Sequence, residues 1–261
     1  MASNTAPMVL VTRPEGLAAQ RLCEQLVEAG YRSCHQPMLV LERVEPLPPE
    51  QRAQLLELDS YQHVIFVSAN AVAFGMGHIE DYWPQLPVGL NWYAVGGATA
   101  ALLAGYGLDV QFPPSQMTSE GLLALNGLAS VQGERVLIVK GEGGRGALRS
   151  ELQARGATVD ELVCYQRGCP SLPPGVLARQ LAQWGVDIAM FSSGEGIVNF
   201  AELLSPAETT TLSAIAIIVP STRVADIARS LGCKHITIAE NATDAAMIRA
   251  LETCTTCPGD R

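Results

Sequence analysis

Small polar side chains follow several apolar runs of the sequence, and isolated cations accompany them. The hydroxyl and amide residues of this set are Ser68, Asn70, Thr99, Ser193, Ser221 and Thr222. The cations are Arg13, Lys140, Arg145, Arg149 and Arg223. Taken one at a time, such residues are typical of helix N-caps and of solvated surfaces. Taken together, at corresponding places behind buried strands, they predict a site rich in hydrogen-bond donors that binds an anion.

A glycine-rich segment, 141–146 (GEGGRG), formally satisfies the G-x-G-x-x-G spacing of a dinucleotide site. Asp160 or Glu161 follows at a suitable distance for an acid that binds a ribose. However, Lys140 separates the apolar run from the first glycine, and the corresponding segment 14–16 has one glycine. We therefore favour a turn whose following helix receives an anion, and keep the dinucleotide site as an alternative.

Motifs for metal or nucleophilic-serine chemistry are missing from the sequence. The four histidines are scattered, and no HExxH or paired CxxC occurs. Cys254 and Cys257 form a single CxxC in a polar tail, which we interpret as incidental. Neither Ser68 nor Ser193 lies in a G-x-S-x-G elbow. We therefore expect no metal and no nucleophilic serine.

Composition restricts the class of protein further. The chain has 261 residues, 48% of them hydrophobic, so it can bury one large core or two ordinary ones. A net charge of -9 disfavours a nucleic-acid surface. The longest apolar run, 214–219, is far too short to cross a membrane, and no signal peptide is recognisable. Seven scattered cysteines are typical of reduced thiols, so we expect a cytoplasmic protein.

The elements that would position the polar residues occur twice. Segment 134–167 changes from an apolar run to helical spacing and back, which predicts strand, helix and strand. Segment 8–43 begins with the same pattern. Downstream, VIFVSANAV from Val64 corresponds to AMFSSGEGI from Ala189, so that Ser68 aligns with Ser193. These echoes predict an internal duplication of a three-unit α/β module.

Alternation of strands and helices implies parallel, doubly wound sheets with their binding turns at one edge. Thr118 is expected to start a helix that runs through Leu128. The domain boundary has two solutions: a cut near 129–133, or crossings at the proline-rich segments 46–49 and 170–174. The second solution makes one domain discontinuous.

The ordered series of segments resembles the uroporphyrinogen-III synthase family. The matching pieces are VLVTRP at Val9, FVSANAV at Phe66, AVGGATAALLAGYG at Ala94, SEGLL at Ser119, VLIVKGEGGRGALRSELQARGATV with Tyr165 following, and FSSGEGIVNF at Phe191. They appear in the family's order over about 9–251, nearly the whole chain. The specificity lies in the order, since each piece alone is weakly specific.

This resemblance implies two doubly wound, mainly parallel-sheet α/β domains of flavodoxin-like type, joined by a two-stranded β ladder. The expected bounds are 1–36 plus 169–261 for a discontinuous domain, 45–160 for the other domain, and 37–44 with 161–168 for the ladder. The family holds its substrate between its domains, largely through backbone amides.

The resemblance implies the catalytic residues, and the polar turns and cations supply the substrate-binding candidates. The catalytic candidates are Tyr165, Thr99 and Thr222. The substrate-binding candidates are Arg13, Ser68, Asn70, Gly97, Lys140, Arg145, Ser193 and Ser221. Because PSTR replaces the expected glycine-led turn, Ser221 is an alternative to Thr222. Tyr165 is either an acid or a buried phenol satisfied by a backbone carbonyl.

The implied reaction is the cyclisation of hydroxymethylbilane, with loss of water and inversion of ring D, to uroporphyrinogen III. The resemblance implies no cofactor and no nucleic-acid or membrane partner; the upstream deaminase supplies the substrate, with channelling left open, and we expect a monomer. Two alternatives stay open at this point: a non-catalytic two-domain protein that binds small anions, and a nucleotide-dependent oxidoreductase that uses 141–146.

Overall fold

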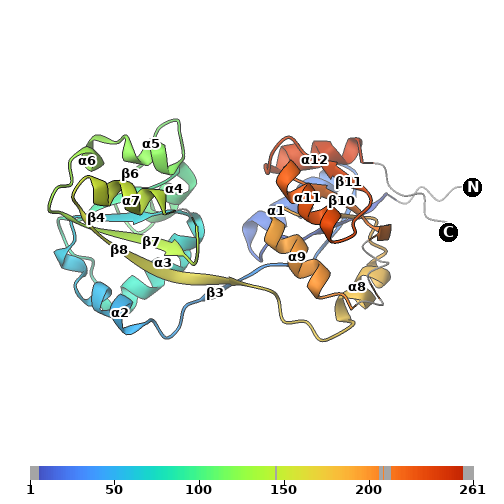
Figure 1. The fold of residues 1–261 in the computed structure, drawn as a ribbon, viewed down its shortest axis with the longest axis horizontal. Coiled ribbons are helices and arrows are strands. Elements are labelled where there is room, and N and C mark those ends of the chain that lie inside the picture. The colour runs from blue at the N-terminus through green and yellow to red at the C-terminus, as the bar shows by residue number, and fades with distance from the viewer. Residues whose placement is uncertain (1–5, 145, 206–207, 209–212, 255–261) are drawn as a thin grey trace, which may run out of the picture. The chain divides into compact units, whose positions relative to one another are not determined.

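The computed structural model describes residues 6–144, 146–205, 208 and 213–254 of the chain. The chain forms two compact units, each with its own sheet (Figure 1). Unit 1 contains Met1–Val40 and Gly168–Arg261, and unit 2 contains Leu41–Arg167. The predicted fold class, α/β with mainly parallel sheets, is confirmed.

Unit 1 is built on a five-stranded sheet in the order β11-β10-β9-β1-β2. Its strands are β1 (Met8–Val11), β2 (Arg32–His35), β9 (Ile188–Met190), β10 (Ala216–Val219) and β11 (Ile236–Ile238). All four strand pairs are parallel. Numbered along the chain, this is the order 2-1-3-4-5 of the flavodoxin-like sheet.

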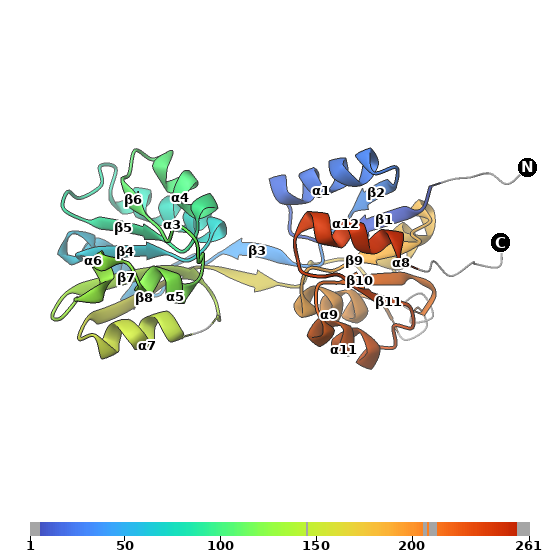
Figure 2. The ribbon, with the colours of Figure 1, turned by 90° about the horizontal axis from the view of Figure 1, so that it is seen from above.

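Helices cover both faces of the unit 1 sheet, because its strands are apolar on both sides. They are α1 (Leu17–Glu28), α8 (Val176–Trp184), α9 (Gly194–Glu202), α11 (Thr222–Ser230) and α12 (Asp244–Glu252). One core joins β strands to α1 and α12, and a second joins them to α8, α9 and α11. Figure 2 shows α1 and α12 on the side of the sheet opposite α9 and α11.

Unit 2 is built on a six-stranded sheet in the order β3-β8-β7-β4-β5-β6. Its strands are β3 (Val40–Arg43), β4 (His63–Phe66), β5 (Asn91–Ala94), β6 (Val110–Gln111), β7 (Arg135–Gly141) and β8 (Thr158–Gly168). Apart from β3, the strand order β8-β7-β4-β5-β6 corresponds to β2-β1-β9-β10-β11 of unit 1. The segments that echo one another in the sequence therefore occupy equivalent places in the two sheets.

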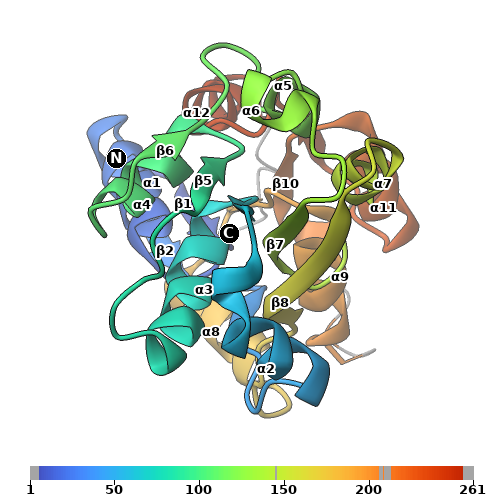
Figure 3. The same ribbon diagram turned by 90° about the vertical axis from the view of Figure 1, so that its left-hand side faces the viewer.

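The helices of unit 2 also form two layers. They are α2 (Pro49–Leu56), the 3₁₀ helix η1 (Leu58–Ser60), α3 (Ala69–Tyr82), α4 (Gly97–Ala104), α5 (Ser119–Leu123), α6 (Asn126–Ala129) and α7 (Ala147–Ala154). Figure 3 shows α3 and α4 on one side of the sheet and α5, α6 and α7 on the other, in agreement with the two cores.

The single helix expected over 118–128 is wrong. The helical backbone stops after Leu123 and restarts at Asn126, with Leu125 in an extended conformation as the N-cap of α6. Leu122, Leu123 and Leu128 are all buried, and the break lets both short helices direct leucines into one core. The domain bounds and the linking ladder over 37–44 and 161–168 stay predictions; in the structure, β3 and β8 are neighbours in the unit 2 sheet.

Candidate active site

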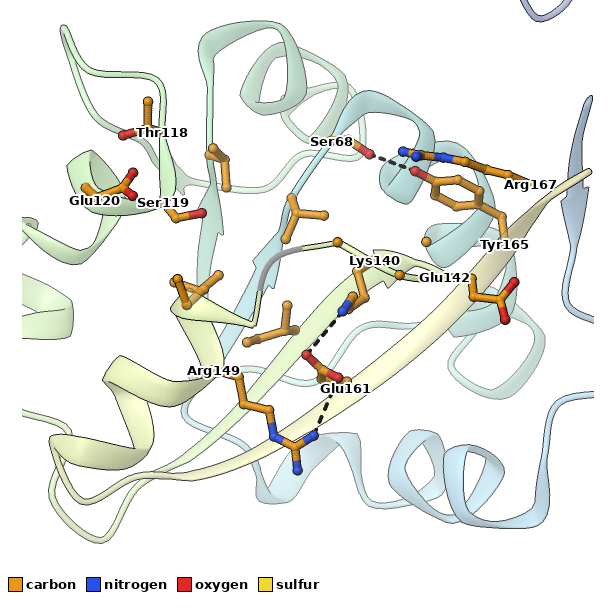
Figure 4. A pocket seen from close by; sticks show the side chains of 18 residues that line it. Ser68, Thr118, Ser119, Glu120, Lys140, Glu142, Arg149, Glu161, Tyr165 and Arg167 are labelled. Atoms are coloured by element: carbon orange, nitrogen blue, oxygen red, sulfur yellow. Dashed lines mark hydrogen bonds and ion pairs between the residues drawn. The ribbon is translucent and has the colours of Figure 1, made fainter. Parts of the chain in front are cut away.

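A pocket of about 410 Å³ lies in unit 2 at the carboxyl ends of β4, β5 and β7 (Figure 4). Strands β7 and β4 are neighbours, but the chain leaves them in opposite directions across the sheet, through α7 to β8 and through α3 to β5. This is the topological switch point, where ligands bind in open α/β sheets. Of the predicted site residues, the pocket brings together Ser68, Lys140 and Tyr165.

Tyr165 reaches the pocket because the register between β7 and β8 shifts. Lys140 pairs with Val163, but the next residue, Gly141, pairs with Tyr165, so Cys164 is an extra residue on β8. The shift turns the Tyr165 ring to the face that carries α3, where it packs 5.2 Å from the ring of Phe74. Only 3% of the residue is exposed.

The hydroxyl of Tyr165 lies 3.5 Å from the hydroxyl of Ser68. A contact of this length is weak, so the phenol keeps its capacity to donate to a ligand. The Ser68 hydroxyl also accepts a 3.1 Å hydrogen bond from the backbone N–H of Ala71 and thereby caps α3. The backbone N–H of Ala71 and the Tyr165 hydroxyl therefore both contact the Ser68 hydroxyl oxygen at the wall of the pocket.

Ser193 repeats the cap in unit 1. Its hydroxyl accepts from the backbone N–H of Gly196, at 3.2 Å, at the start of α9. The alignment of Ser68 with Ser193 in the sequence thus corresponds to the same local structure in both units. Ser193 is held in place by this hydrogen bond, as expected for the structural role of a small hydroxyl residue behind a strand.

A charged cluster lines the pocket on the α7 side. Glu161 of β8 accepts from the ammonium of Lys140 at 3.3 Å and lies 3.6 Å from the guanidinium of Arg149 on α7. Figure 4 shows both contacts, with Glu161 between the two cations. Glu120, Glu142 and Arg167 also line the pocket. Among the lining residues that the structure describes, three cations are thus matched by three carboxylates.

The other predicted residues of unit 2 lie elsewhere. Thr99 is a buried residue of α4, 6% exposed, and Asn70 is exposed in the first turn of α3. The Cα of Gly97, at the start of α4, faces the side chains of Phe112 and Met117. None of these three is in the described lining of the pocket. Arg145 lies outside the described residues, as does Cys257.

In unit 1, Arg13 lies at the equivalent switch point, where it follows β1 and contacts Ser192, which follows β9. Its guanidinium pairs with Asp244 at 2.5 Å and donates to the Ser192 hydroxyl at 3.0 Å. Ser221 is the N-cap residue of α11, without a side-chain capping hydrogen bond, and Thr222 is the exposed first residue of that helix. The predicted cation Arg13 therefore has partners within its own unit, whereas Thr222 is an exposed residue.

Sequence reasoning missed the role of Glu161 and the contributions of Thr118, Ser119 and Arg167 to the pocket. A signal for Glu161 does exist, because Asp160 and Glu161 are adjacent charged residues that interrupt the apolar positions in the first half of β8. Asp160 turns away and accepts from the Tyr61 hydroxyl at 2.7 Å, with Arg135 at 3.2 Å. The strand register needed to tell the two acids apart is not visible in the sequence.

Cys164, next to Tyr165, is not a nucleophile. Burial raises the pKa of its thiol to about 12, so the thiolate is scarce at neutral pH. The thiol donates to the backbone carbonyl of Lys140 at 3.2 Å. It therefore stabilises the shifted register that presents Tyr165.

Within the described part of the chain, no group of three or more histidine, cysteine, aspartate or glutamate side chains is arranged to hold a metal ion. None of the helices that the structure describes is long and apolar enough to cross a membrane.

Comparisons with known proteins give a consistent result. Residues 20–249 match the family model described as uroporphyrinogen-III synthase HemD. Uroporphyrinogen-III synthase of Salmonella typhimurium is 34% identical over 251 residues, which cover 94% of this chain and 99% of that protein. The Escherichia coli protein of the same name is 33% identical over 252 residues, with the same coverage.

Solved structures support the fold. The uroporphyrinogen-III synthetase of Helicobacter pylori superposes with a TM-score of 0.59 at 14% identity, covering 95% of this chain and 99% of that one. A mutant uroporphyrinogen III synthase of Thermus thermophilus gives 0.52 at 20% identity, with 95% and 100% coverage. With a family model over most of its length and relatives above 30% identity over nearly all of it, the chain belongs to the uroporphyrinogen-III synthase family.

Proposed function

We propose that the chain closes hydroxymethylbilane to uroporphyrinogen III and that the pocket of unit 2 takes part in this reaction. The observation that carries the proposal is the Tyr165 hydroxyl, held by a buried ring at the wall of a pocket that also presents Lys140 and Arg149. A phenol is an acid that can assist a leaving hydroxide, and the cations match a substrate with eight carboxylates.

The first step assigned to Tyr165 is the departure of the hydroxymethyl oxygen of ring A. The phenol donates its proton to this oxygen, the carbon–oxygen bond breaks, and water leaves together with formation of an azafulvene cation. The weak contact between Tyr165 and Ser68 supports this role, since little is lost when the phenol turns its hydrogen bond to the substrate. The proton returns to the enzyme when the macrocycle becomes neutral again.

The second task is control of the ring that attacks the cation. Ring D attacks through its already substituted carbon, forms a spiro intermediate, fragments and recloses inverted. Spontaneous closure gives isomer I, so the protein must hold the conformer that leads to the spiro route. The pocket volume of about 410 Å³ suits one pyrrole ring with its acidic side chains, which makes it an anchor for part of the tetrapyrrole.

Carboxylate binding is assigned to Lys140, with the backbone N–H groups and hydroxyls at the helix starts. Ser68, Ser193 and Ser221 stand at N-caps, where backbone donors and the helix dipole favour an anion. Thr99 and Thr222 stay proposed catalytic residues, and Arg13, Asn70, Gly97 and Arg145 stay proposed substrate-binding residues. Arg13 already has Asp244 as its partner.

The finer description of the enzyme follows from this reaction. Loss of water with ring closure makes it a hydro-lyase. We also infer a monomer that takes its substrate from the upstream deaminase in the cytoplasm, consistent with free cysteines such as Cys34 and Cys233, whose thiol pKa values are raised by desolvation. Size-exclusion chromatography with light scattering checks the oligomeric state, and a pull-down with the deaminase checks channelling.

The experiment that tests the function generates hydroxymethylbilane in situ with the deaminase and adds this protein without metal or nucleotide. Products are oxidised, and the isomers are separated by chromatography. Isomer III is expected to predominate. If isomer I predominates as in the reaction without this protein, while circular dichroism shows a folded chain, the proposal is rejected and anion binding becomes the working interpretation.

A further inference from the structure

Glu161 occupies the position in the pocket where a substrate carboxylate would be expected. It lies within 3.3 Å of the Lys140 ammonium and 3.6 Å of the Arg149 guanidinium, on three different elements, β8, β7 and α7. The side chains of Lys140 and Glu161 are only 15% and 22% exposed, whereas that of Arg149 is 48% exposed. Lys140, a partly buried lysine at the wall of the pocket, therefore already has an anionic partner within the protein.

The sheet register fixes this arrangement. Glu161 pairs with Ile138 and Val163 pairs with Lys140, so Glu161 and Lys140 are diagonal neighbours on one face of the sheet. Helix α7 packs on the same face of the sheet and places Arg149 beside Glu161. Because two neighbouring strands and a packed helix hold the three groups, the carboxylate is part of the built site rather than a mobile surface residue.

We propose that Glu161 is a positioning residue that acts as a built-in counter-ion: it holds Lys140 in place and limits how tightly the pocket binds carboxylates. This inference rests on the proposed function. Substrate and product carry the same eight carboxylates, so a contact between a cation and a carboxylate stabilises both equally. Without Glu161, Lys140 and Arg149 would hold the product as firmly as the substrate and delay its release.

Two properties separate this role from a purely structural one. Removal of the Glu161 charge should strengthen binding of substrate and product together, which a structural defect would not do. Most of the effect should also depend on Lys140, because Glu161 lies closer to the Lys140 ammonium, at 3.3 Å, than to the more exposed Arg149 guanidinium, at 3.6 Å. Both properties can be measured as ratios between variants.

The test compares the wild type with Glu161→Gln, which keeps the shape and removes the charge. Initial rates at increasing hydroxymethylbilane concentration give KM, and added uroporphyrinogen III, kept reduced, gives the product inhibition constant. Both constants are expected to fall about three- to fivefold, as for removal of a partly exposed charge, with the proportion of isomer III unchanged. Raising the salt concentration should reduce the difference.

Three further variants complete the test. Glu151→Gln removes a charge from α7 outside the pocket, where Glu151 pairs with Arg155, and controls for net charge. Lys140→Met should raise KM. The double variant Lys140→Met with Glu161→Gln should have a KM within about twofold of that of Lys140→Met alone, as coupled residues do.

If Glu161→Gln is folded and its KM equals or exceeds that of the wild type, the inference is wrong. An unchanged KM in Lys140→Met would also overturn the inference. This second result can be obtained even if Glu161→Gln does not fold. Failure of the function itself would show as no isomer III from the wild type.

Discussion

Gly141 leaves the space that the Tyr165 ring fills: a Cβ atom at position 141 would lie 2.3 Å from Cζ of that ring. The two residues are paired across β7 and β8 directly after the register shift. Because the ring is also packed against Phe74, it cannot retreat without moving its neighbours. The Tyr165 ring can therefore take its position only because residue 141 is a glycine.

Gly141→Ala is expected to displace Tyr165 and to cost about 1–3 kcal/mol of unfolding free energy, as for overpacking of a core. Isomer III formation should fall at least about tenfold, because small displacements of a catalytic group are costly. Urea unfolding and the isomer assay measure the two effects. Gly77→Ala on α3 is the matched control: its Cβ would meet nothing within 4 Å, so it should be neutral or stabilising. Equal behaviour of the two variants would contradict the argument.

Tyr165→Phe removes the phenolic hydroxyl and leaves the ring that packs against Phe74. Turnover is expected to fall roughly ten- to a hundredfold, as for loss of an assisting acid. Stability should change little, since the lost contact to Ser68 is long, at 3.5 Å. The measurement is steady-state turnover with isomer analysis. Unchanged turnover and isomer yield in a folded variant would remove Tyr165 from the acid role.

The sequence predicted the repeated strand–helix–strand units well, because apolar runs and helical spacing are local signals. It could not show that Cys164 is an extra residue in the β7–β8 pairing, and the orientation of Tyr165 depends on that residue. Likewise, Asp160 and Glu161 are adjacent in the sequence, but only Glu161 lines the pocket. Whether Arg13 is available to a ligand was also invisible, since its partner Asp244 is far away in the chain. The local pattern of apolar residues determines where strands and helices form. The pairing register between strands distant in the sequence determines which side chains line the pocket.

Ser68→Ala and Ser193→Ala remove equivalent helix caps from the two units. Each variant should lose about 1 kcal/mol of stability in urea unfolding, the usual value of such a cap. Only Ser68 also contacts the Tyr165 hydroxyl. Turnover should therefore fall further in Ser68→Ala than in Ser193→Ala when both are compared at equal stability. A larger loss in Ser193→Ala would place the more important hydroxyl in unit 1.

Arg13→Gln breaks the ion pair with Asp244 and the hydrogen bond to Ser192. Because Arg13 is held within unit 1 by these groups, we expect turnover to fall less than about threefold, in the range of a partly exposed ion pair. Rates at saturating and low substrate measure kcat and kcat/KM. A loss of tenfold or more in kcat/KM at unchanged stability would show that Arg13 leaves Asp244 to bind substrate.

His78 gives the pH dependence a definite sign. The residue is buried on α3, and its pKa is lowered below 6.5 by burial and by the guanidinium of Arg43, against smaller opposing effects of the Cys164 backbone, Asp81 and Glu45. The unfolded chain therefore binds a proton at a higher pH than the folded chain. Above pH 6.5 His78 is neutral in both states and the folded chain has its full stability. This stability is lost as the pH falls through the pKa that His78 has in the folded chain.

The free energy of unfolding should accordingly decrease between pH 7.5 and 5.5 in the wild type, by at most about 1.4 kcal/mol per pH unit from this one group. His78→Gln is expected to be less stable at pH 7.5, because a buried ring that contacts Arg43 is lost, but its stability should change less over the same interval. Urea unfolding of both proteins at the two pH values gives the difference between slopes, in which contributions of all other groups cancel. Parallel slopes would mean that His78 is not the group that couples protonation to the stability of this unit.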